Sequence, residues 1–355
     1  MKTYFEELKE KGYYLIAEIG VNYYDIAEKK RIALLDAAKL MIKEAKQCGI
    51  NAVKFQSYKA EKLAAKLSPA YWDLKEESTT SQYELFKKYD LFGKHEYTIL
   101  KKYCDELEIM FMSTPFDFEA VDYLQELVEI YKISSSDITN LPFLEYIAKK
   151  DKPIIISTGA SNLDEIIKAV QVIKAYNNKP LTIMHCVLEY PTPLQHANLF
   201  KIKSLINEFP NEIIGYSDHT KPTENALVQI TAYSMGASVI EKHFTLDKTL
   251  KGNDHYHAMD VNDAKKIIHN LELVKEIKGN ADIYCLESEQ LARENARRSI
   301  VAKCAISSGT QITREMLTFK RPGKGISPDR ISDILGKFAK TDIEEDTILN
   351  EFMIE

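Results

Sequence analysis

The sequence predicts an α/β fold, a (β/α)8 TIM barrel followed by a small C-terminal domain, on three observations. Apolar runs of strand length alternate with helical stretches over most of the chain, which is typical of parallel sheets. Nearly every run ends in a residue that can do chemistry, and in closed barrels the active site lies where the strands end. The runs are eight in number, at residues 13–20, 52–56, 110–115, 130–137, 153–159, 181–187, 213–219 and 239–244.

The stretches between the runs have helical periodicity. Over residues 31–48 the apolar side chains fall on one stripe, and Gly49 follows as a residue that can end a helix. Residues 118–128 and 163–176 repeat this pattern, with Ser161 or Asn162 as the N-cap of the second. A helix between consecutive strands implies parallel strands and right-handed crossovers. The stripe of the first helix consists of Ile32, Leu35, Ala38, Met41, Ile42 and Ala45.

One insertion interrupts this rhythm, between the second strand and the helix near residues 95–107. Residues 57–93 are polar and aromatic and exceed the length of an ordinary βα loop. Long loops on the catalytic face serve as lids or substrate walls. A surface helix without a role at the site is the other interpretation, and both stay open.

The pattern changes after residue 244. A polar loop over 246–260 leads into a helix over 261–278 that completes the barrel, so we expect a barrel domain at 1–283. A charged linker at 284–298 and a compact module of short strands at 299–355 follow. A module of about 60 residues is small for independent stability, and we expect it to lean on another surface.

Composition limits the classes of partner and the compartment. The chain has 355 residues and a net charge of −6, so no overall basic field attracts nucleic acid or a membrane surface. Its five cysteines are widely spread, and none has a partner at zinc-ligand spacing. No apolar run reaches the length of a signal peptide core or a membrane span. These features predict a soluble cytoplasmic protein with reduced thiols.

Two histidines predict a metal site. His219 and His243 end the seventh and eighth strands, which are neighbours in a closed barrel. Two imidazoles converging there can bind a divalent metal ion and leave positions open for water and substrate. Glu18 ends the first strand, next to the eighth, and could hold a water beside the metal. Two ordinary hydrogen-bonded histidines are the alternative. The sequence assigns no metal role to His185, His255 or His257.

Two lysines predict an anion pocket. Lys54 and Lys132 end strands two and four, and a lysine is costly to bury unless an anion meets it. Hydroxyl groups end four strands, at Thr114, Ser135, Ser157 and Ser217. Together they describe a pocket for a phosphate and a carboxylate, although either lysine could instead extend along the barrel rim. Asp254 follows the last strand and either reaches the barrel mouth or forms an Asx turn.

These residues, in this order, resemble the sialic acid synthase family, also called the N-acetylneuraminate synthase family. The resemblance covers nearly the whole chain. It is carried by residues 17–22 (AEIGVN), 53–56 (VKFQ), 113–117 (STPFD), 131–133 (YKI), 157–159 (STG), 190–193 (YPTP), 215–220 (GYSDHT) and 240–244 (IEKHF). Residues 320–328 (KRPGKGISP) resemble the antifreeze-like SAF domain of that family, a β-clip fold.

The resemblance implies a metal-dependent transferase that forms a carbon–carbon bond. Phosphoenolpyruvate would condense with a 2-acetamido-sugar aldehyde, N-acetylmannosamine or a 2,4-diacetamido-trideoxyhexose. The product would be a nine-carbon 2-keto acid, with phosphate released by C–O cleavage. Mn²⁺ or Mg²⁺ would be held by His219 and His243, with Glu18 on a neighbouring water. The implied catalytic residues are Glu18, Lys54, Lys132 and Asp254.

The resemblance also implies the substrate contacts. Arg321 would be inserted over the active site by the C-terminal domain of the partner subunit, which makes the protein a domain-swapped homodimer. The phosphoenolpyruvate cradle would be Lys54, Thr114, Lys132, Ser135, Ser157 and Ser217. The sugar contacts would be Gln56, Asp137, Tyr190, Asp254 and Arg321.

Three positions depart from the neuraminate-forming members. Those enzymes have Asn where this chain has Leu188, Glu where it has Asp137, and Pro where it has Asn253. Loss of a polar contact at Leu188 fits a deoxygenated or differently acylated sugar, and residues 185–190 and 138–142 look closer to the legionaminate-type branch. Two other functions stay open: a related synthase that makes a seven- or eight-carbon keto acid, and a sugar-binding barrel without catalysis.

Overall fold

The computed structural model describes residues 2–252 and 254–355. The chain divides into two compact units, Met1–Gly279 and Asn280–Glu355. In the described ranges, none of the helices combines the length and the apolar character that crossing a bilayer requires.

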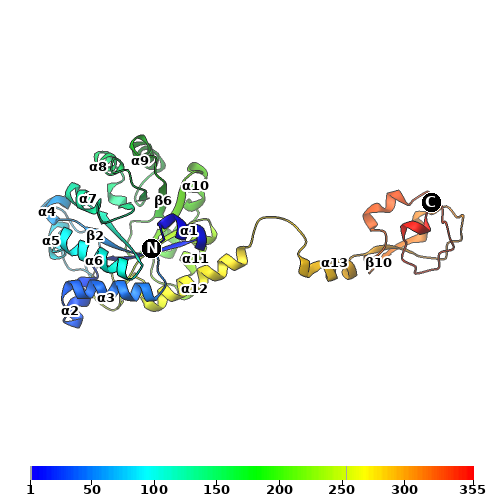
Figure 1. The fold of residues 1–355 in the computed structure, drawn as a ribbon, viewed down its shortest axis with the longest axis horizontal. Coiled ribbons are helices and arrows are strands. Elements are labelled where there is room, and N and C mark those ends of the chain that lie inside the picture. The colour runs from blue at the N-terminus through cyan, green and yellow to red at the C-terminus, as the bar shows by residue number, and fades with distance from the viewer. Residues whose placement is uncertain (1, 253) are drawn as a thin grey trace. The chain divides into compact units, whose positions relative to one another are not determined.

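The first unit is the predicted barrel. Its eight parallel strands pair in the order β3-β2-β1-β8-β7-β6-β5-β4, and β3 contacts β4, so the sheet curves round on itself with the helices outside it (Figure 1). The strands are β1 (Tyr14–Gly20), β2 (Ala52–Ser57), β3 (Met110–Pro115), β4 (Tyr131–Ile133), β5 (Ile154–Ser157), β6 (Leu181–Cys186), β7 (Ile213–Asp218) and β8 (Val239–His243).

The interior of the barrel is layered because side chains of a strand alternate between its two faces. Towards the start of the strands, inward residues such as Ile16, Met112 and Val239 form an apolar cluster. Helix α1 (Tyr4–Lys11) closes this end, where the Tyr4 hydroxyl lies 3.0 Å from Thr182 Oγ1. Two residues further along the same face the side chains become polar. The interior is therefore a filled core beneath a polar mouth.

The outer helices follow the predicted periodicity, with one difference. The helix predicted over residues 31–48 is α3 (Leu34–Gln47) and begins three residues later than expected, because a separate helix, α2 (Tyr23–Lys30), precedes it and ends at Arg31, which takes a left-handed conformation. Ile32 therefore lies outside the stripe and is 38% exposed. Asn162, rather than Ser161, caps α9. The remaining barrel helices are α6 (Lys94–Glu106), α7 (Phe118–Leu124), α8 (Leu141–Ala148), α9 (Leu163–Tyr176), α10 (Lys201–Glu208), α11 (Leu227–Ser234) and α12 (Val261–Lys278).

Strand four is shorter than its apolar run. β4 ends at Ile133, and Ser135–Asp137 form a 3-10 turn, η1. The reason is local, because the hydroxyl of Ser134 accepts a hydrogen bond from the Ser136 amide and starts the turn. Ser135 and Asp137 therefore stand on a turn above the strand rather than in it.

The insertion forms its own small structure. It contains α4 (Ala60–Leu63) and α5 (Gln82–Lys88), with an antiparallel bridge between Pro69 and Ser81. Trp72 is buried in it, and its indole N–H donates to the carbonyls of Glu77 and Thr79 at 3.1 Å. These contacts hold the insertion in a defined shape.

The second unit has a core of its own. β9 (Ser299–Ala302) pairs antiparallel with β10 (Leu317–Lys320), and short bridges tie later segments to them. The stretch expected as a linker contains α13 (Gln290–Ala296), and the Glu294 carbonyl accepts a hydrogen bond from the Gly323 amide at 2.7 Å. The buried side chains in the core of the second unit include Ile300, Ile306, Ile312, Leu317, Ile334 and Leu349.

Candidate active site

The polar mouth gathers most of the residues that the sequence singled out. One cavity there is lined by Glu18, Lys54, Gln56, Thr114, Lys132, Ser135, Ser157, Tyr190, Ser217, His219 and His243. They come together because each sits at the carboxyl end of its strand or just beyond it, and parallel strands share that end. Phe116, Ser134, Cys186, Leu188 and Glu241 complete the lining.

Four buried charges form a connected cluster in this cavity. Glu18 is ion-paired with Lys54, whose ammonium lies 3.8 Å from Glu241 Oε1. Lys132 donates to the same Glu241 oxygen at 3.1 Å. All four side chains are at least 94% buried. We call Glu18, Lys54, Lys132 and Glu241 the inner cluster.

The electrostatics of the inner cluster follow from burial and mutual pairing. Although burial alone would raise the pKa of Glu241, the ammonium groups of Lys132 and Lys54 lower it to about 2. Burial lowers the pKa of Lys132, against the attraction of Glu241. Burial raises the pKa of Glu18, and Lys54 opposes this. With both acids ionised, two carboxylates cancel two ammonium groups.

The hydroxyls lie where the sequence predicted, around the lysines. Thr114 accepts a hydrogen bond from Lys54 at 3.1 Å, and Ser217 donates to Glu241 Oε1 at 3.1 Å. Ser135 accepts from the Gly159 amide at 2.8 Å. Two buried oxygens, Ser157 Oγ and Glu241 Oε2, have no hydrogen-bond partner. A buried polar group without a hydrogen bond costs free energy, so these two oxygens indicate that a polar ligand binds here.

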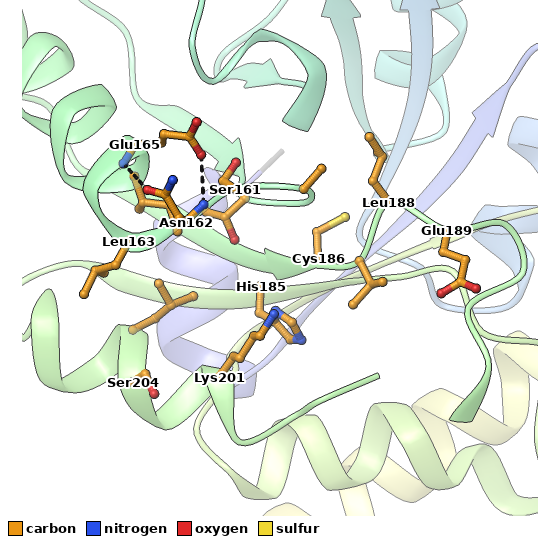
Figure 2. A pocket seen from close by; sticks show the side chains of 15 residues that line it. Ser161, Asn162, Leu163, Glu165, His185, Cys186, Leu188, Glu189, Lys201 and Ser204 are labelled. Carbon is orange, nitrogen blue, oxygen red and sulfur yellow. Dashed lines mark hydrogen bonds between the residues drawn. The ribbon is translucent and has the colours of Figure 1, made fainter. Parts of the chain in front are cut away.

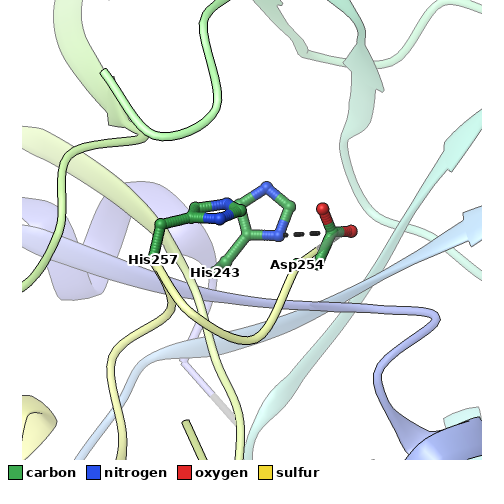
Figure 3. Close-up of side chains that lie close together, drawn as sticks. All are labelled: His243, Asp254 and His257. Atoms are coloured by element: carbon green, nitrogen blue, oxygen red, sulfur yellow. Dashed lines mark ion pairs between the residues drawn. The ribbon is translucent and has the colours of Figure 1, made fainter. Parts of the chain in front are cut away.

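Three histidines lie beside the inner cluster. His219 Nδ1 lies 2.7 Å from the Val187 carbonyl, and because a carbonyl only accepts, Nδ1 carries a proton and Nε2 is the nitrogen that can bind a ligand when the ring is neutral. Although burial lowers the pKa of His219, the neighbouring Cys186 and the Val187 carbonyl raise it overall. The rings of His219 and His243 are 5.5 Å apart between centroids. His257, from the loop after β8, places its ring 4.7 Å from that of His243. Asp254 Oδ2 lies 3.6 Å from His243 Nδ1 on the other side (Figure 3).

The residues present fit a divalent metal ion. Ligand atoms of His243, Asp254 and His257 all lie within 4.8 Å of one another. His243 Nδ1 and both ring nitrogens of His257 are buried without a hydrogen bond. Burial, reinforced by the neighbouring histidines, lowers the pKa of both rings well below the usual range, so both are neutral and their lone pairs are available. Neutral imidazole and carboxylate are the donors that such ions take.

An outer chamber opens above the mouth. Asp137, Tyr190 and Asp254 line it, and it shares Gln56, Leu188, Tyr190 and His243 with the inner cavity. The insertion supplies one wall, through Leu63, Tyr71, Gln82, Leu85, Phe86 and Tyr89. The insertion therefore lines the chamber and is not a remote surface helix. Burial raises the pKa of Asp254 to about 6 and raises the pKa of Asp137.

Two site residues escaped the sequence analysis. Glu241 precedes His243 by two residues on β8, so strand alternation alone places it on the same inward face. His257 stands in an irregular loop, where no periodicity indicates its direction. The other unassigned histidines have structural partners: His185 Nε2 lies 2.7 Å from the Ala197 carbonyl, and His255 bridges Thr245 and Asp25. Asn253 lies outside the described residues.

A second cavity lies beside the barrel mouth, between the start of α9 and α10. Ser161, Asn162, Glu165, Lys201 and Ser204 line it, and Cys186 and Leu188 line both this cavity and the inner one (Figure 2). Asn162 and Glu165 cap α9, because the Glu165 carboxylate accepts from the Asn162 amide at 2.9 Å and the Asn162 side-chain oxygen accepts from the Glu165 amide at 3.0 Å, so one side-chain oxygen of each is already used. The chemistry-bearing side chains converge in the inner cavity instead.

Comparison with known proteins agrees with this geometry. The family described as NeuB matches residues 41–282, and the SAF domain matches residues 297–355. The chain belongs to the NeuB family. It is 38% identical to N,N'-diacetyllegionaminic acid synthase of Campylobacter jejuni, over 95% of this chain and 98% of that protein. N-acetylneuraminate-9-phosphate synthase of Mus musculus is 34% identical, with 96% and 92% of the two chains covered.

The fold of this NeuB-family chain is also similar to that of a solved structure. The N-acetylneuraminic acid synthetase of Leptospira borgpetersenii, in complex with citrate, has 34% identity and a TM-score of 0.68 and covers 79% of this chain and 90% of its own. The second unit is the SAF domain of the family, as the sequence predicted. Arg321 belongs to that unit, directly after β10.

Proposed function

We propose that this protein condenses phosphoenolpyruvate with a 2,4-diacetamido-trideoxyhexose aldehyde to form a nine-carbon 2-keto acid and phosphate. The observation that carries this is the convergence of two buried lysines, four hydroxyl side chains and three histidines at one barrel mouth. The NeuB-family relatives named as legionaminic and neuraminic acid synthases support the reaction class.

The inner cavity suits phosphoenolpyruvate. Lys54 and Lys132 would exchange part of their pairing with Glu18 and Glu241 for the phosphate and the carboxylate of the substrate. Ser157 Oγ, which has no partner, would donate to one of these oxygens. Thr114, Ser135 and Ser217 would fix its orientation. The entropic cost of aligning the two reactants is then met on binding and no longer adds to the barrier of the chemical step. Charge-assisted contacts of this kind are the strong ones.

The outer chamber suits the sugar, and two departures indicate which one. Leu188 lines both chambers and offers an apolar surface where an asparagine would offer hydrogen bonds. Asp137 reaches about 1.5 Å less far than a glutamate. Both changes favour a sugar that lacks a hydroxyl or has a second acyl group. Gln56, Tyr190 and Asp254 remain as polar contacts around it.

The reaction needs four events from these residues. The substrate methylene carbon attacks the aldehyde carbon, and its carbon two becomes electron-poor. The aldehyde oxygen takes up a proton and becomes a hydroxyl. Water adds to carbon two, with Glu18 as the group that receives one of its protons, and the C–O bond to phosphate then breaks as the second water proton leaves and the keto group forms. A divalent ion, when bound by His219 and His243, supplies Lewis-acid polarisation of the aldehyde. The insertion wall would limit entry of bulk water during these steps.

The charge of the inner cluster supports a further role for Arg321. Because two carboxylates cancel two ammonium groups there, the trianionic substrate must be balanced by charge from elsewhere. A divalent ion held by His219 and His243 would supply two of the three charges, and Arg321 of a partner subunit would supply the third. We therefore propose a homodimer with exchanged C-terminal domains.

Phosphate release tests the function. The full-length protein with Mn²⁺ or Mg²⁺ should release phosphate from phosphoenolpyruvate with a 2,4-diacetamido-trideoxyhexose, and more slowly with N-acetylmannosamine. Release with four- or five-carbon aldose phosphates instead would show a synthase for seven- or eight-carbon acids. Sugar binding without release would show a barrel that has lost catalysis.

Mixing two inactive variants tests the exchanged dimer. Arg321→Ala and His219→Ala subunits should regain activity together, because a mixed dimer contains one site with both residues intact. Random assortment makes about half of the dimers mixed, so recovery should approach about a quarter of wild-type sites. If subunits exchange and no activity returns, Arg321 does not act across the dimer.

A further inference from the structure

We infer that His257 is an additional protein ligand of the divalent metal ion, so that three imidazoles hold it instead of two. The inference rests on the metal site of the proposed function, where His219 and His243 are the protein ligands, and it adds His257 to them as a third. It would make this centre richer in nitrogen than a pair of histidines can provide.

The first observation is that His257 is buried and unsatisfied. Its side chain is 0% exposed, and neither ring nitrogen has a hydrogen-bond partner. Two other buried histidines of this unit, His185 and His255, each have hydrogen-bond partners. A buried imidazole without a hydrogen bond costs free energy unless something binds it.

The second observation is where the ring lies. His257 has ring-centroid separations of 4.7 Å from His243 and 6.2 Å from His219, the two histidines that end β8 and β7. It forms a group with His243 and Asp254 whose ligand atoms lie within 4.8 Å of one another. Two ligands of one ion at about 2.1 Å can be up to about 4.2 Å apart, so small rotations bring this group into coordinating range.

The side chains around His257 pack against its ring but form no hydrogen bond with its nitrogens. Tyr190 and Tyr256 present ring faces and edges to it, at centroid distances of 5.5 and 5.1 Å. The Tyr256 hydroxyl is engaged elsewhere, donating to the Tyr190 carbonyl at 2.8 Å. An aromatic enclosure of this kind holds a ring in place but satisfies neither nitrogen. Asp254 and His257 thus lie on either side of His243 (Figure 3), with the ligand atoms of all three within 4.8 Å of one another.

The third imidazole should change which ion is preferred. Carboxylate and water ligands suit Mg²⁺ and Mn²⁺, whereas imidazole suits Zn²⁺, Co²⁺ and Ni²⁺. Loss of one direct nitrogen ligand should therefore weaken Zn²⁺ and Co²⁺ more than Mg²⁺. The class of ligand for this site is a borderline first-row transition ion.

Metal titration of the full-length protein without substrates tests the inference. His257→Phe keeps an aromatic ring in the enclosure and removes both nitrogens; it should lower Zn²⁺ affinity by at least about 100-fold, since even indirect partners of metal ligands are worth 10- to 100-fold. Mg²⁺ affinity should fall by much less. His269→Ala, an exposed histidine on α12, is the control and should bind as wild type.

A second measurement needs no variant. X-ray absorption of the Zn²⁺-loaded wild-type protein should count three imidazoles around the ion. Two imidazoles, or unchanged Zn²⁺ affinity in folded His257→Phe, would overturn the inference. Because neither readout uses turnover, failure here leaves phosphate release as an independent test of the proposed function.

Discussion

Two groups of buried polar side chains lie on or directly after the same two strands, β7 and β8; one group points outward to the helices and the other points into the barrel. Asp218 and Lys242 point outward to the helices, where their charged atoms are 2.6 Å apart. Lys242 also donates to the Thr220 carbonyl, and Asp218 accepts from Tyr216, Gln229 and the Thr220 amide. Ser217, Glu241, His219 and His243 point inward. There, Glu241 Oε2 and His243 Nδ1 have no hydrogen bond.

The difference separates structure from function. The outward pair satisfies its own hydrogen bonds, so it can hold two strands together but has nothing to offer a ligand. The inward groups are left with free donors and acceptors in a cavity, which costs stability and is retained where a ligand repays it. Substitutions of the outward pair should therefore lower stability, whereas substitutions of the inward groups should lower activity.

The largest effect is expected at the histidines. His243→Ala should abolish metal-dependent turnover while the barrel stays folded, because β8 keeps its strand pairing with β1 and β7. Phosphate release after chelation and re-addition of Mn²⁺, together with circular dichroism, would show this. A wild-type rate of phosphate release in this variant would show that His243 is not a ligand of the metal ion.

The outward pair should respond in stability instead. Asp218→Asn leaves the Lys242 ammonium without its counter-ion at a side chain that is 0% exposed, and breaking a buried pair costs about 3–5 kcal/mol. Denaturant unfolding would measure the loss. A fully stable single variant would show that the outward pair is not structural.

An effect of intermediate size is expected at Lys54, on the inward face. Lys54→Ala should raise KM for phosphoenolpyruvate by about 30- to 1000-fold, because a buried contact between ammonium and phosphate contributes about 2–4 kcal/mol. KM for the sugar should change far less. A raised sugar KM with an unchanged phosphoenolpyruvate KM would reverse the assignment of the two chambers.

The smallest effect is expected at the apolar edge of the sugar chamber. Leu188→Asn should shift preference towards N-acetylmannosamine by about tenfold in relative kcat/KM, as one polar contact in a pocket does. Competing the two sugars in one assay measures this ratio directly. An unchanged ratio would mean that Leu188 does not select the sugar.

Strand-end residues could be predicted because they depend on periodicity alone. His219, His243, Lys54 and Lys132 lie in one cavity since parallel strands end together. Glu241 obeys the same rule, because it lies two residues before His243 on β8 and strand alternation places both on the inward face. The same alternation places Lys242, which stands between Glu241 and His243, on the outward face.

Loop residues were beyond the reach of the same reasoning. His257 is buried against His243 by the path of an irregular loop, which has no repeating pattern to extrapolate. Ser135 and Asp137 were expected at the end of a strand, and the Ser134 hydroxyl turned the chain into a 3-10 turn instead. Local side-chain hydrogen bonds of this kind compete with strand formation and are hard to weigh from sequence.

Calorimetric titration of phosphoenolpyruvate into the Mn²⁺-loaded full-length protein tests most directly whether the inward face is a substrate site. The wild-type protein should bind it, and Lys132→Ala should bind it at least about 30-fold more weakly. No binding to the wild-type protein, or equal affinity in both proteins, would contradict the assignment of the inner cluster to this substrate.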